Sequence, residues 1–382
     1  MKKQGKSTFS KIIAWLHLWP SIVAGIILVF VSLTGTIIVY GDEIMQWSAG
    51  KEALYVEPEG IPLRIDQITA IHKEKFPGES FSYVIVDKDP AKSWIINSVN
   101  PKERKPRFVY INPYTGEILK QDNTIGFFYV VAHLHSNLLM GSTGGWIVAI
   151  STIVFVLSTL TGLVLWWPKR WTKATRDSSF KIKWKARFKR LNYDLHNVFG
   201  FYSAIVCFLL GMTGLLIFFS PMMKGMISLF GGEGKMWFYT LQDYPRDTVA
   251  TKDMAFYDTN TLIKKAFDMH PDKKIIRIWT YNYDNVSIYP FFLGTNAGLK
   301  SEENKEAIYF DKFTGKIVND GKKQKIYDKV DNLVWQIHMG QWWGQLGKLS
   351  TFIAGLIATT LPITGFLVWW GRRKKKSKTK KQ

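Results

Sequence analysis

The stretch LVWQIHMGQWWGQLG, over Leu333–Gly347, leads into the last hydrophobic run of the chain and carries one histidine, His338. A shift of 203 positions places this stretch on the region around His135. The same shift aligns Gly144 with Gly347, Gly162 with Gly365, and Trp166-Trp167 with Trp369-Trp370. His338 therefore has a counterpart in the first half of the chain.

A second shift, of 179 positions, aligns the starts of two other hydrophobic runs. It places Leu195-His196 on Leu16-His17 and Thr213-Gly214 on Thr34-Gly35. Self-similarity at a fixed offset indicates a repeated architecture. We therefore interpret four of the seven histidines as two repeated pairs: His17 with His196, and His135 with His338.

The net charge of +21 is concentrated in three segments that adjoin hydrophobic runs. Segments 1–11, 168–195 and 371–382 hold 22 lysines and arginines, which with Asp177 and Asp194 account for +20 of that charge. Under the positive-inside rule, such segments lie in the cytoplasm. We expect both termini and the middle loop to be cytoplasmic, and we expect no nucleic-acid partner, because the charge does not cover one globular surface.

Four apolar runs are long enough to cross a hydrocarbon core of about 30 Å. They cover Leu18–Tyr40, Ile147–Trp167, Phe199–Met223 and Leu349–Trp370. The first run is too long for a secretory signal and lacks a cleavage site, so we interpret it as an uncleaved membrane helix. Pro20 lies near its start, where a missing N–H costs least.

Two polar segments between these runs are each predicted to fold as a helix followed by antiparallel strands. In the first segment the helix is Leu63–Phe76 and the strands are Phe81–Asp87, Ser93–Val99 and Arg107–Asn112. In the second the helix is Thr261–Met269 and the strands are Ile275–Tyr281 and Val286–Phe292. A similar turn, Tyr110–Glu117 in one and Tyr309–Lys316 in the other, follows at an offset of 199.

These features predict an α-helical integral membrane protein with four transmembrane helices arranged as two repeats. Each repeat carries an inserted extracytoplasmic α+β domain. The expected segments are a basic N-terminus with helix 1 (1–41), the first external domain (42–124), an outer segment with helix 2 (125–167), a basic cytoplasmic loop (168–195), helix 3 (196–223), the second external domain (224–328), an outer segment with helix 4 (329–371) and a basic tail (372–382).

The paired histidines favour haem over other metal centres. Cys207 is the only cysteine, so this chain offers no C-x-x-C-H haem attachment and no cysteine-ligated cluster. Structural zinc takes four ligands and catalytic zinc usually three, whereas haem iron needs only two axial ligands from the protein. We therefore expect one haem b per pair, with His17 and His196 at the cytoplasmic face and His135 and His338 at the outer face. Gly35, Gly162, Gly214 and Gly365 are expected to admit the macrocycle or to permit close helix packing.

The remaining histidines carry weaker expectations. On a helix, His133 and His135 point about 200° apart, so both cannot face one iron. The repeat selects His135, and His133 remains either a supporting residue or an alternative cofactor ligand. His72 and His270 lie in the external segments without repeat partners, and we expect them at the surface.

Several segments together resemble the PepSY-associated transmembrane family, which includes iron-regulated membrane proteins and ferrisiderophore reductases of the bacterial inner membrane. The resemblance is carried by WLHLWPSIVAGIILVFVSLTG, YINPYTGEIL, LHSNLLMG, DLHNVFGFYSAIV, IHMG and ITGFLVWW. It covers nearly the whole chain and follows the internal duplication. It implies two PepSY domains, two haems b with axial ligands His17, His196, His135 and His338, and reduction of a ferric siderophore to release Fe(II).

The expected mechanism takes electrons from a separate donor at the His17/His196 site to the His135/His338 site and on to the ferric chelate. Side chains that bind the chelate are suggested by composition alone: Arg104, Arg107, Trp279, Tyr281 and Tyr283. Two alternatives stay open. One is a membrane-anchored PepSY protein that binds partners or regulates a protease without redox activity, and the other is a transmembrane reductase for another acceptor.

Overall fold

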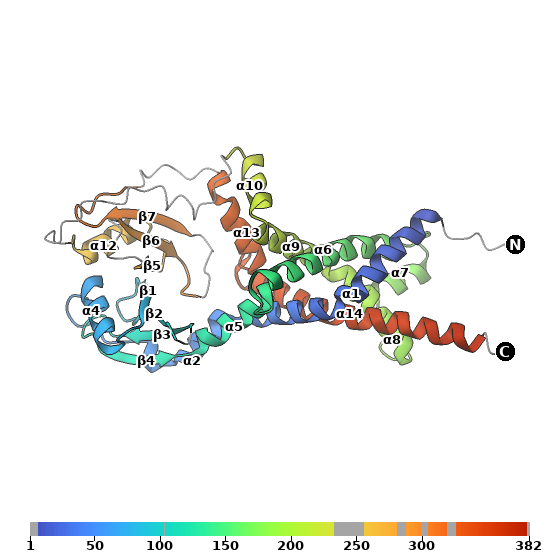
Figure 1. Cartoon of the computed structure of the whole chain (residues 1–382), viewed down its shortest axis with the longest axis horizontal. Coiled ribbons are helices and arrows are strands. Elements are labelled where there is room, and N and C mark those ends of the chain that lie inside the picture. Colours follow the sequence, from blue (N-terminus) through green and yellow to red (C-terminus); the bar gives the residue numbers. More distant parts are fainter. Residues whose placement is uncertain are drawn as a thin grey trace. The chain divides into compact units, whose positions relative to one another are not determined.

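The structure is a computed structural model that describes residues 7–102, 104–232, 256–280, 288–298, 305–318 and 326–379 (Figure 1). Within these residues four helices are long and apolar enough to cross a membrane. They are α1 (Thr8–Ile38), α6 (Gly141–Trp166), the span Phe188–Phe218, and α14 (Gly344–Thr379). All four expected crossings are therefore present, and the chain is a membrane protein.

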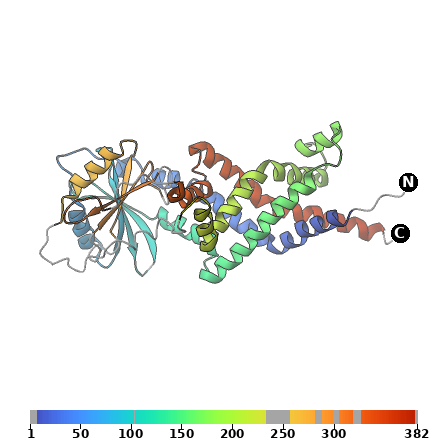
Figure 2. The ribbon, with the colours of Figure 1, turned by 90° about the horizontal axis from the view of Figure 1, so that it is seen from above.

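The four long helices pack side by side into a helical unit (Figures 1 and 2). Helix α1 contacts α6 and α14, and each of these contacts α9 (Gly200–Phe218) in turn. Their outward faces carry exposed apolar side chains such as Val23, Ile26, Ile150 and Ile205. Such surfaces suit lipid, because exposed apolar patches of this kind mark membrane or protein contacts.

Helix α1 begins earlier than its apolar run, and Pro20 therefore lies inside it rather than near its start. The Ser7 side chain accepts a hydrogen bond from the backbone N–H of Ser10, which caps the new start. Pro20 has no N–H to donate to the previous turn. The adjacent Ser21 hydroxyl donates to the carbonyl of His17 at 2.5 Å, next to the Leu16 carbonyl that lacks a donor at position 20.

The third span is not a regular α-helix throughout. It consists of α8 (Phe188–Asp194), a π-helical turn over Leu195–Phe199, and α9. The span ends at Phe218 rather than at Met223, because Pro221 occupies the first turn of a new helix, α10 (Ser220–Leu229). π-helical turns are rare and often mark functional positions. This one contains His196.

A second compact unit contains a seven-stranded antiparallel sheet with the order β4-β3-β2-β1-β5-β6-β7. The strands are β1 (Ser80–Asp87), β2 (Trp94–Asn100), β3 (Lys105–Ile111), β4 (Ile118–Asp122), β5 (Ile275–Trp279), β6 (Ile288–Gly294) and β7 (Glu306–Asp311). Strands β1 and β5 pair from Tyr83 with Trp279 to Asp87 with Ile275. Strands from the two predicted external segments thus form one sheet.

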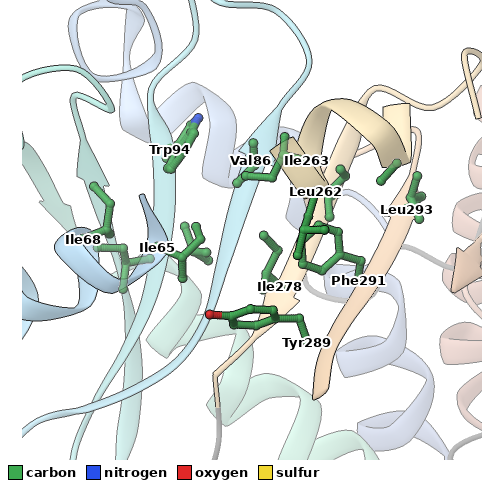
Figure 3. Packing of buried hydrophobic residues seen from close by; sticks show 14 of the residues in the cluster. Ile65, Ile68, Val86, Trp94, Leu262, Ile263, Ile278, Tyr289, Phe291 and Leu293 are labelled. Atoms are coloured by element: carbon green, nitrogen blue, oxygen red, sulfur yellow. The ribbon is translucent and has the colours of Figure 1, made fainter. Parts of the chain in front are cut away.

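Both faces of this sheet are buried, which explains the continuous apolar stretches within its strands. One face packs against α4 (Ile65–Lys75) and α12 (Thr259–Met269) in a single core that both segments share (Figure 3). The other face packs against α2 (Gly41–Ala49), α3 (Lys51–Leu54) and the start of α5 (Thr124–Asn137). We expected two separate external domains. The shared core is the physical reason why the two segments instead form one compact unit.

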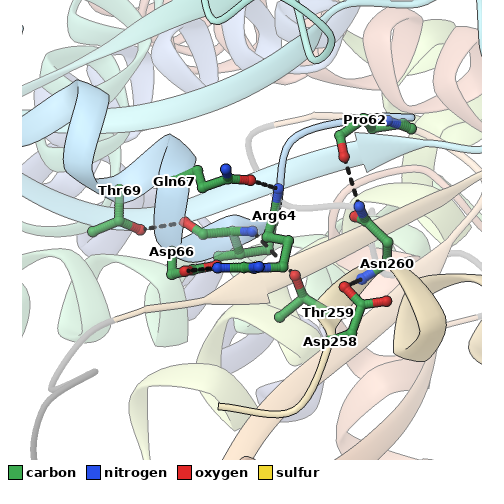
Figure 4. A network of polar contacts seen from close by, with 9 residues as sticks. Pro62, Arg64, Asp66, Gln67, Thr69, Asp258, Thr259 and Asn260 are labelled. Atoms are coloured by element: carbon green, nitrogen blue, oxygen red, sulfur yellow. Dashed lines mark hydrogen bonds and ion pairs between the residues drawn. The ribbon is translucent and has the colours of Figure 1, made fainter. Parts of the chain in front are cut away.

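Polar contacts also join the two segments where α4 and α12 begin (Figure 4). The Thr259 hydroxyl accepts a hydrogen bond from the backbone N–H of Ile65 at 3.1 Å, and Asn260 donates to the carbonyl of Pro62 at 2.6 Å. Asp258 caps α12 by accepting from the N–H groups of Asn260 and Thr261. Each helix start therefore depends on residues of the other segment.

His72 is fully buried between α4 and the sheet, so the expectation that it lies at the surface was wrong. Its Nε2 lies 2.8 Å from the Ser98 hydroxyl, which in turn donates to Glu79, and Glu79 pairs with Arg107. Burial lowers the pKa of His72 to about 4, although Glu79 opposes the shift. His72 is thus a neutral core residue at physiological pH.

Candidate functional site

The first histidine pair lies between α1 and the π-helical turn of the third span. The rings of His17 and His196 have centroids 6.2 Å apart and an interplanar angle of 71°. His17 Nδ1 lies 3.0 Å from the Ser158 carbonyl and 3.3 Å from the Thr161 hydroxyl, both on α6. His196 Nδ1 lies 3.0 Å from the Thr364 hydroxyl on α14. Four helices therefore meet at this pair.

The second pair lies on two short helices, α5 and α13 (Val330–His338). The rings of His135 and His338 have centroids 6.0 Å apart and an interplanar angle of 47°. His135 Nδ1 lies 2.8 Å from the Val31 carbonyl on α1, and His338 Nδ1 lies 3.0 Å from the Thr213 hydroxyl on α9. The structure thus brings together both predicted pairs.

The chain turns sharply after each histidine of the second pair. Leu138 and Leu139 have positive φ values of 53° and 58°, and α6 begins only at Gly141. After His338, Gly340 and Gly344 have φ values of 70° and 54°, and α14 begins at Gly344. Positive φ is the left-handed region that glycine tolerates best. Left-handed residues therefore break the helix between each histidine and the following span: Leu138, Leu139 and Gly141 in the first case, and Gly340 and Gly344 in the second.

The hydrogen bonds fix the proton of each ring on Nδ1. A backbone carbonyl can only accept, so His17 and His135 must donate from Nδ1. The Thr213 hydroxyl already donates to the Leu209 carbonyl at 2.7 Å, and the Thr364 hydroxyl donates to Thr360 at 3.0 Å. These hydroxyls then accept from His338 and His196. In all four rings the lone pair is on Nε2, the form in which neutral imidazole binds a metal.

A threonine-glycine step on each long helix receives one histidine ring. A Cβ atom added to the glycine would lie 2.8 Å from the ring of His135 at Gly35, 3.0 Å from His196 at Gly365, 3.1 Å from His17 at Gly162 and 3.3 Å from His338 at Gly214. The glycines therefore make room for the histidine rings. Both members of the step were visible in the sequence, at positions 34–35 and 213–214 among others, but their role as the receiving surface was not recognised.

The spacing within each pair is compatible with two histidine ligands to one haem iron. A metal bound by two imidazole nitrogens would lie about 2 Å from each, taking the zinc value as a guide. The ring centroids, 6.2 Å apart in one pair and 6.0 Å in the other, would leave room for such a metal between the rings. The donor set of two neutral imidazoles also fits haem.

His133 stays outside both ring pairs described above. Helix α5 continues through residues 133 and 135, so the two side chains leave it in nearly opposite directions. This is the geometry on which the choice of His135 rested. Whether His133 supports the second pair or binds a cofactor elsewhere stays a prediction.

The residues suggested for chelate binding lie in the sheet unit. Arg107 is half-buried, is paired with Glu79 and lies over the Phe76 ring at 4.7 Å, so its guanidinium has a structural role. Trp279 packs on Tyr83, with ring centroids 5.0 Å apart. Arg104 is exposed in a turn with a φ of 53°. Tyr281 and Tyr283 lie outside the described residues.

Comparison with known proteins identifies one family. A family model described as the PepSY-associated TM region matches residues 14–372. A search of curated proteins returned no match. The matched range includes all four paired histidines, the threonine-glycine steps that receive them, and the whole sheet.

Proposed function

Since the chain belongs to the PepSY-associated transmembrane family, we propose that it is a dihaem b reductase that passes electrons across the bacterial inner membrane to a ferric siderophore. The acceptor and the membrane follow from the resemblance of the sequence to ferrisiderophore reductases. The haem assignment is supported by the chain's own residues.

One observation carries the haem assignment: two histidine pairs have almost the same ring separation and the same bonded ring nitrogen. His17 and His196 would hold one haem, and His135 and His338 the other. A single buried histidine is common in proteins. Two pairs with ring separations of 6.2 Å and 6.0 Å are less common, because each of the four rings must be positioned by a different long helix. Hydrogen bonds from Nδ1 also raise the basicity of a ligating ring and fix its orientation.

Bound haem b would supply reversible one-electron chemistry, and the protein would supply binding, orientation and the local polarity. Val31 and Ser158 do this through backbone carbonyls, and Thr213 and Thr364 through hydroxyls. These hydrogen bonds hold each ring with the lone pair of its Nε2 available for a ligand.

The two pairs lie at different depths of the helical unit. His17 is near the start of α1, whereas His135 contacts Val31 and Gly35 near its end. Fourteen residues of helix separate His17 from Val31, or about 21 Å. The start of α1, the end of α14 and helix α7 (Lys173–Phe180) lie at one end of the four helices (Figures 1 and 2). With these basic segments in the cytoplasm, the His17–His196 pair faces inward and the His135–His338 pair outward.

The test is a reduced-minus-oxidised absorption spectrum of the detergent-extracted full chain, with haem quantified per polypeptide. We expect two low-spin haems b per chain. The reduced protein should then be reoxidised by a ferric siderophore while a ferrous chelator reports release of Fe(II). A colourless protein would overturn the proposal and favour the anchored binding protein. Two haems with no reoxidation by ferric chelates would favour a reductase for another acceptor.

A further inference from the structure

The sheet unit contains a pocket of about 500 Å³ at the seam between its two segments. Its walls come from α2 and α3, the end of β1 with the turn that follows, the start of β5 and the residues after β6. Pockets that hold small molecules usually have about this volume. The pocket has no part in the proposed haem sites.

The walls are tied together by backbone hydrogen bonds. Lys88 N–H donates to the Lys274 carbonyl at 2.7 Å, and Lys274 N–H donates to Gly294 at 2.9 Å. On the other side, Ser93 N–H donates to the Leu54 carbonyl at 3.1 Å. The pocket is therefore preformed, which lowers the entropy cost of binding a ligand.

Two hydroxyl groups in the lining lack a partner. The Ser93 Oγ and Thr295 Oγ1 atoms are buried and have no hydrogen-bond partner within the part of the chain that the structure describes. Ser93 as a whole is only 5% exposed. Buried hydroxyls are nearly always hydrogen-bonded in folded proteins, so such groups call for an explanation. A polar ligand in the pocket provides one.

Charged groups in the lining indicate the chemistry of that ligand. Lys92 lies with its Nζ 3.5 Å from the centre of the Tyr55 ring, and Lys274 lies directly before β5. Both act electrostatically on the Asp87 carboxyl. The lysines favour an anionic group, whereas the carboxylates of Asp87 and Asp89 can only accept hydrogen bonds when ionised. A ligand that fits this mixture has both carboxylates and hydroxyl donors.

We propose that this pocket binds a small hydroxycarboxylate, either free or as its ferric chelate. Its carboxylates pair with Lys92 and Lys274 and accept hydrogen bonds from the Ser93 and Thr295 hydroxyls, and its hydroxyl donates to Asp87 or Asp89. The aliphatic side chains of Leu54, Ile95 and Ile275 line the remainder. Only the ferric form rests on the proposed function, because binding of the free anion requires no redox activity.

Isothermal titration calorimetry on the detergent-solubilised full chain tests this proposal. The probes are citrate, gallium(III) citrate as a redox-inert analogue of the ferric chelate, and inorganic phosphate. Binding of citrate or of gallium citrate supports the proposal, and the tighter of the two shows whether the pocket prefers the free anion or the chelate. Failure of both to bind, or phosphate binding as tight as citrate, overturns it.

Two variants locate the site. Lys274→Gln and Thr295→Val should each weaken binding about tenfold, because each removes a bond to a charged or buried partner. Lys264→Gln removes the same charge from the exposed side of α12, outside the pocket, and should bind like wild type. Wild-type affinity in both pocket variants would exclude this location.

A footprinting measurement on the wild type covers the case in which a variant fails to fold. Citrate should protect Lys92 and Lys274 from amine acetylation, as read by mass spectrometry, but should leave Lys264 unchanged; equal labelling of all three contradicts the proposal. Haem content is measured in the same samples. Two haems without citrate binding would reject the pocket and keep the proposed function, and citrate binding without haem would do the reverse.

Discussion

The His17–His196 pair and the His135–His338 pair have almost the same ring separation but are built on different backbones. The first pair lies within the membrane spans, with His17 on regular helix and His196 on a π-helical turn. The second pair lies at the ends of two short helices that stop before the spans begin. What the pairs share is the receiving surface, a threonine-glycine step on the neighbouring long helix. Ring position therefore depends more on the receiving helix than on the helix that carries the histidine.

The difference predicts unequal tolerance to substitution. A histidine on a continuous span is held by the helix on both sides. A histidine at the end of a short helix depends also on the turn that follows it, and both turns of the second pair use left-handed backbone. We expect the second pair to be the weaker site.

The largest effect should come from removing a ligand. His338→Ala should abolish the second haem and leave the first, halving the haem content, and His196→Ala should do the converse. Haem per chain and low-spin electron paramagnetic resonance signals measure this. His270→Ala changes a histidine at the end of α12 in the sheet unit, so it is the matched control and should retain both haems. Full haem content with an unchanged spectrum in His338→Ala would rule out the second site.

The next effect should come from the glycines that receive the rings. An added methyl group at Gly35 would lie 2.8 Å from the His135 ring, but at Gly214 it would lie 3.3 Å from His338. A Cβ contact below 3.0 Å is essentially never seen, so Gly35→Ala should displace the His135 ring. A contact of 3.3 Å is only tight, so Gly214→Ala should require a small shift of the His338 ring. Haem retention after gel filtration should therefore fall further in Gly35→Ala. Equal retention would contradict the receiving role.

A smaller effect should follow from removing one hydrogen-bond acceptor. Thr213→Val deletes the hydroxyl that accepts from His338 while keeping the side-chain shape. Loss of such a partner typically lowers metal affinity by about tenfold or more. Thr152→Val is the control, because the Thr152 hydroxyl bonds to the Val148 carbonyl of its own helix α6. Redox titration of each haem would show the change, and a shift confined to Thr152→Val would contradict the assignment.

The backbone difference itself can be tested by Gly344→Ala and Gly200→Ala. Gly344 has a φ of 54°, an added methyl there meets nothing within 4 Å, and left-handed backbone costs a non-glycine residue about 1–2 kcal/mol. Gly200 follows the π-helical turn, and an added methyl there meets only Leu361 at an ordinary 3.7 Å. Thermal release of the second haem should occur at a lower temperature in Gly344→Ala, whereas Gly200→Ala should leave the first haem unchanged.

The smallest effect concerns the loss of folding stability at acidic pH, which we expect to depend on His72 and not on either histidine pair. The pKa of His72 is about 4 in the folded chain and near 6.5 when unfolded. The unfolded chain therefore binds more protons between these values, and stability falls as pH drops from about 6.5 to 4. His72→Gln should flatten this part of the pH dependence of the urea midpoint. An unchanged slope would show that other groups dominate.

Much of the helical unit could be predicted from the sequence, because length and hydropathy define a membrane span and the two offsets align the histidines. The pairing of His17 with His196 and of His135 with His338 followed from that alignment. Other features depend on contacts between distant residues. The burial of His72 requires Ser98 and Arg107 to fold over it, and the pairing of Tyr83 with Trp279 joins residues 196 positions apart. The helix breaks near Gly340 depend on φ values that composition alone does not specify.

The pairing of β1 with β5 also has a consequence for biogenesis. Strands β1 to β4 leave the ribosome before α6 and α9, whereas β5 follows both spans. Until β5 arrives, β1 is an open sheet edge, and open edges promote aggregation. Such non-local pairing is also intrinsically slow. The second and third spans are therefore synthesised before the sheet can be completed. A chain truncated after α9 would leave the β1 edge of the four-stranded part unpaired, and such an edge promotes aggregation.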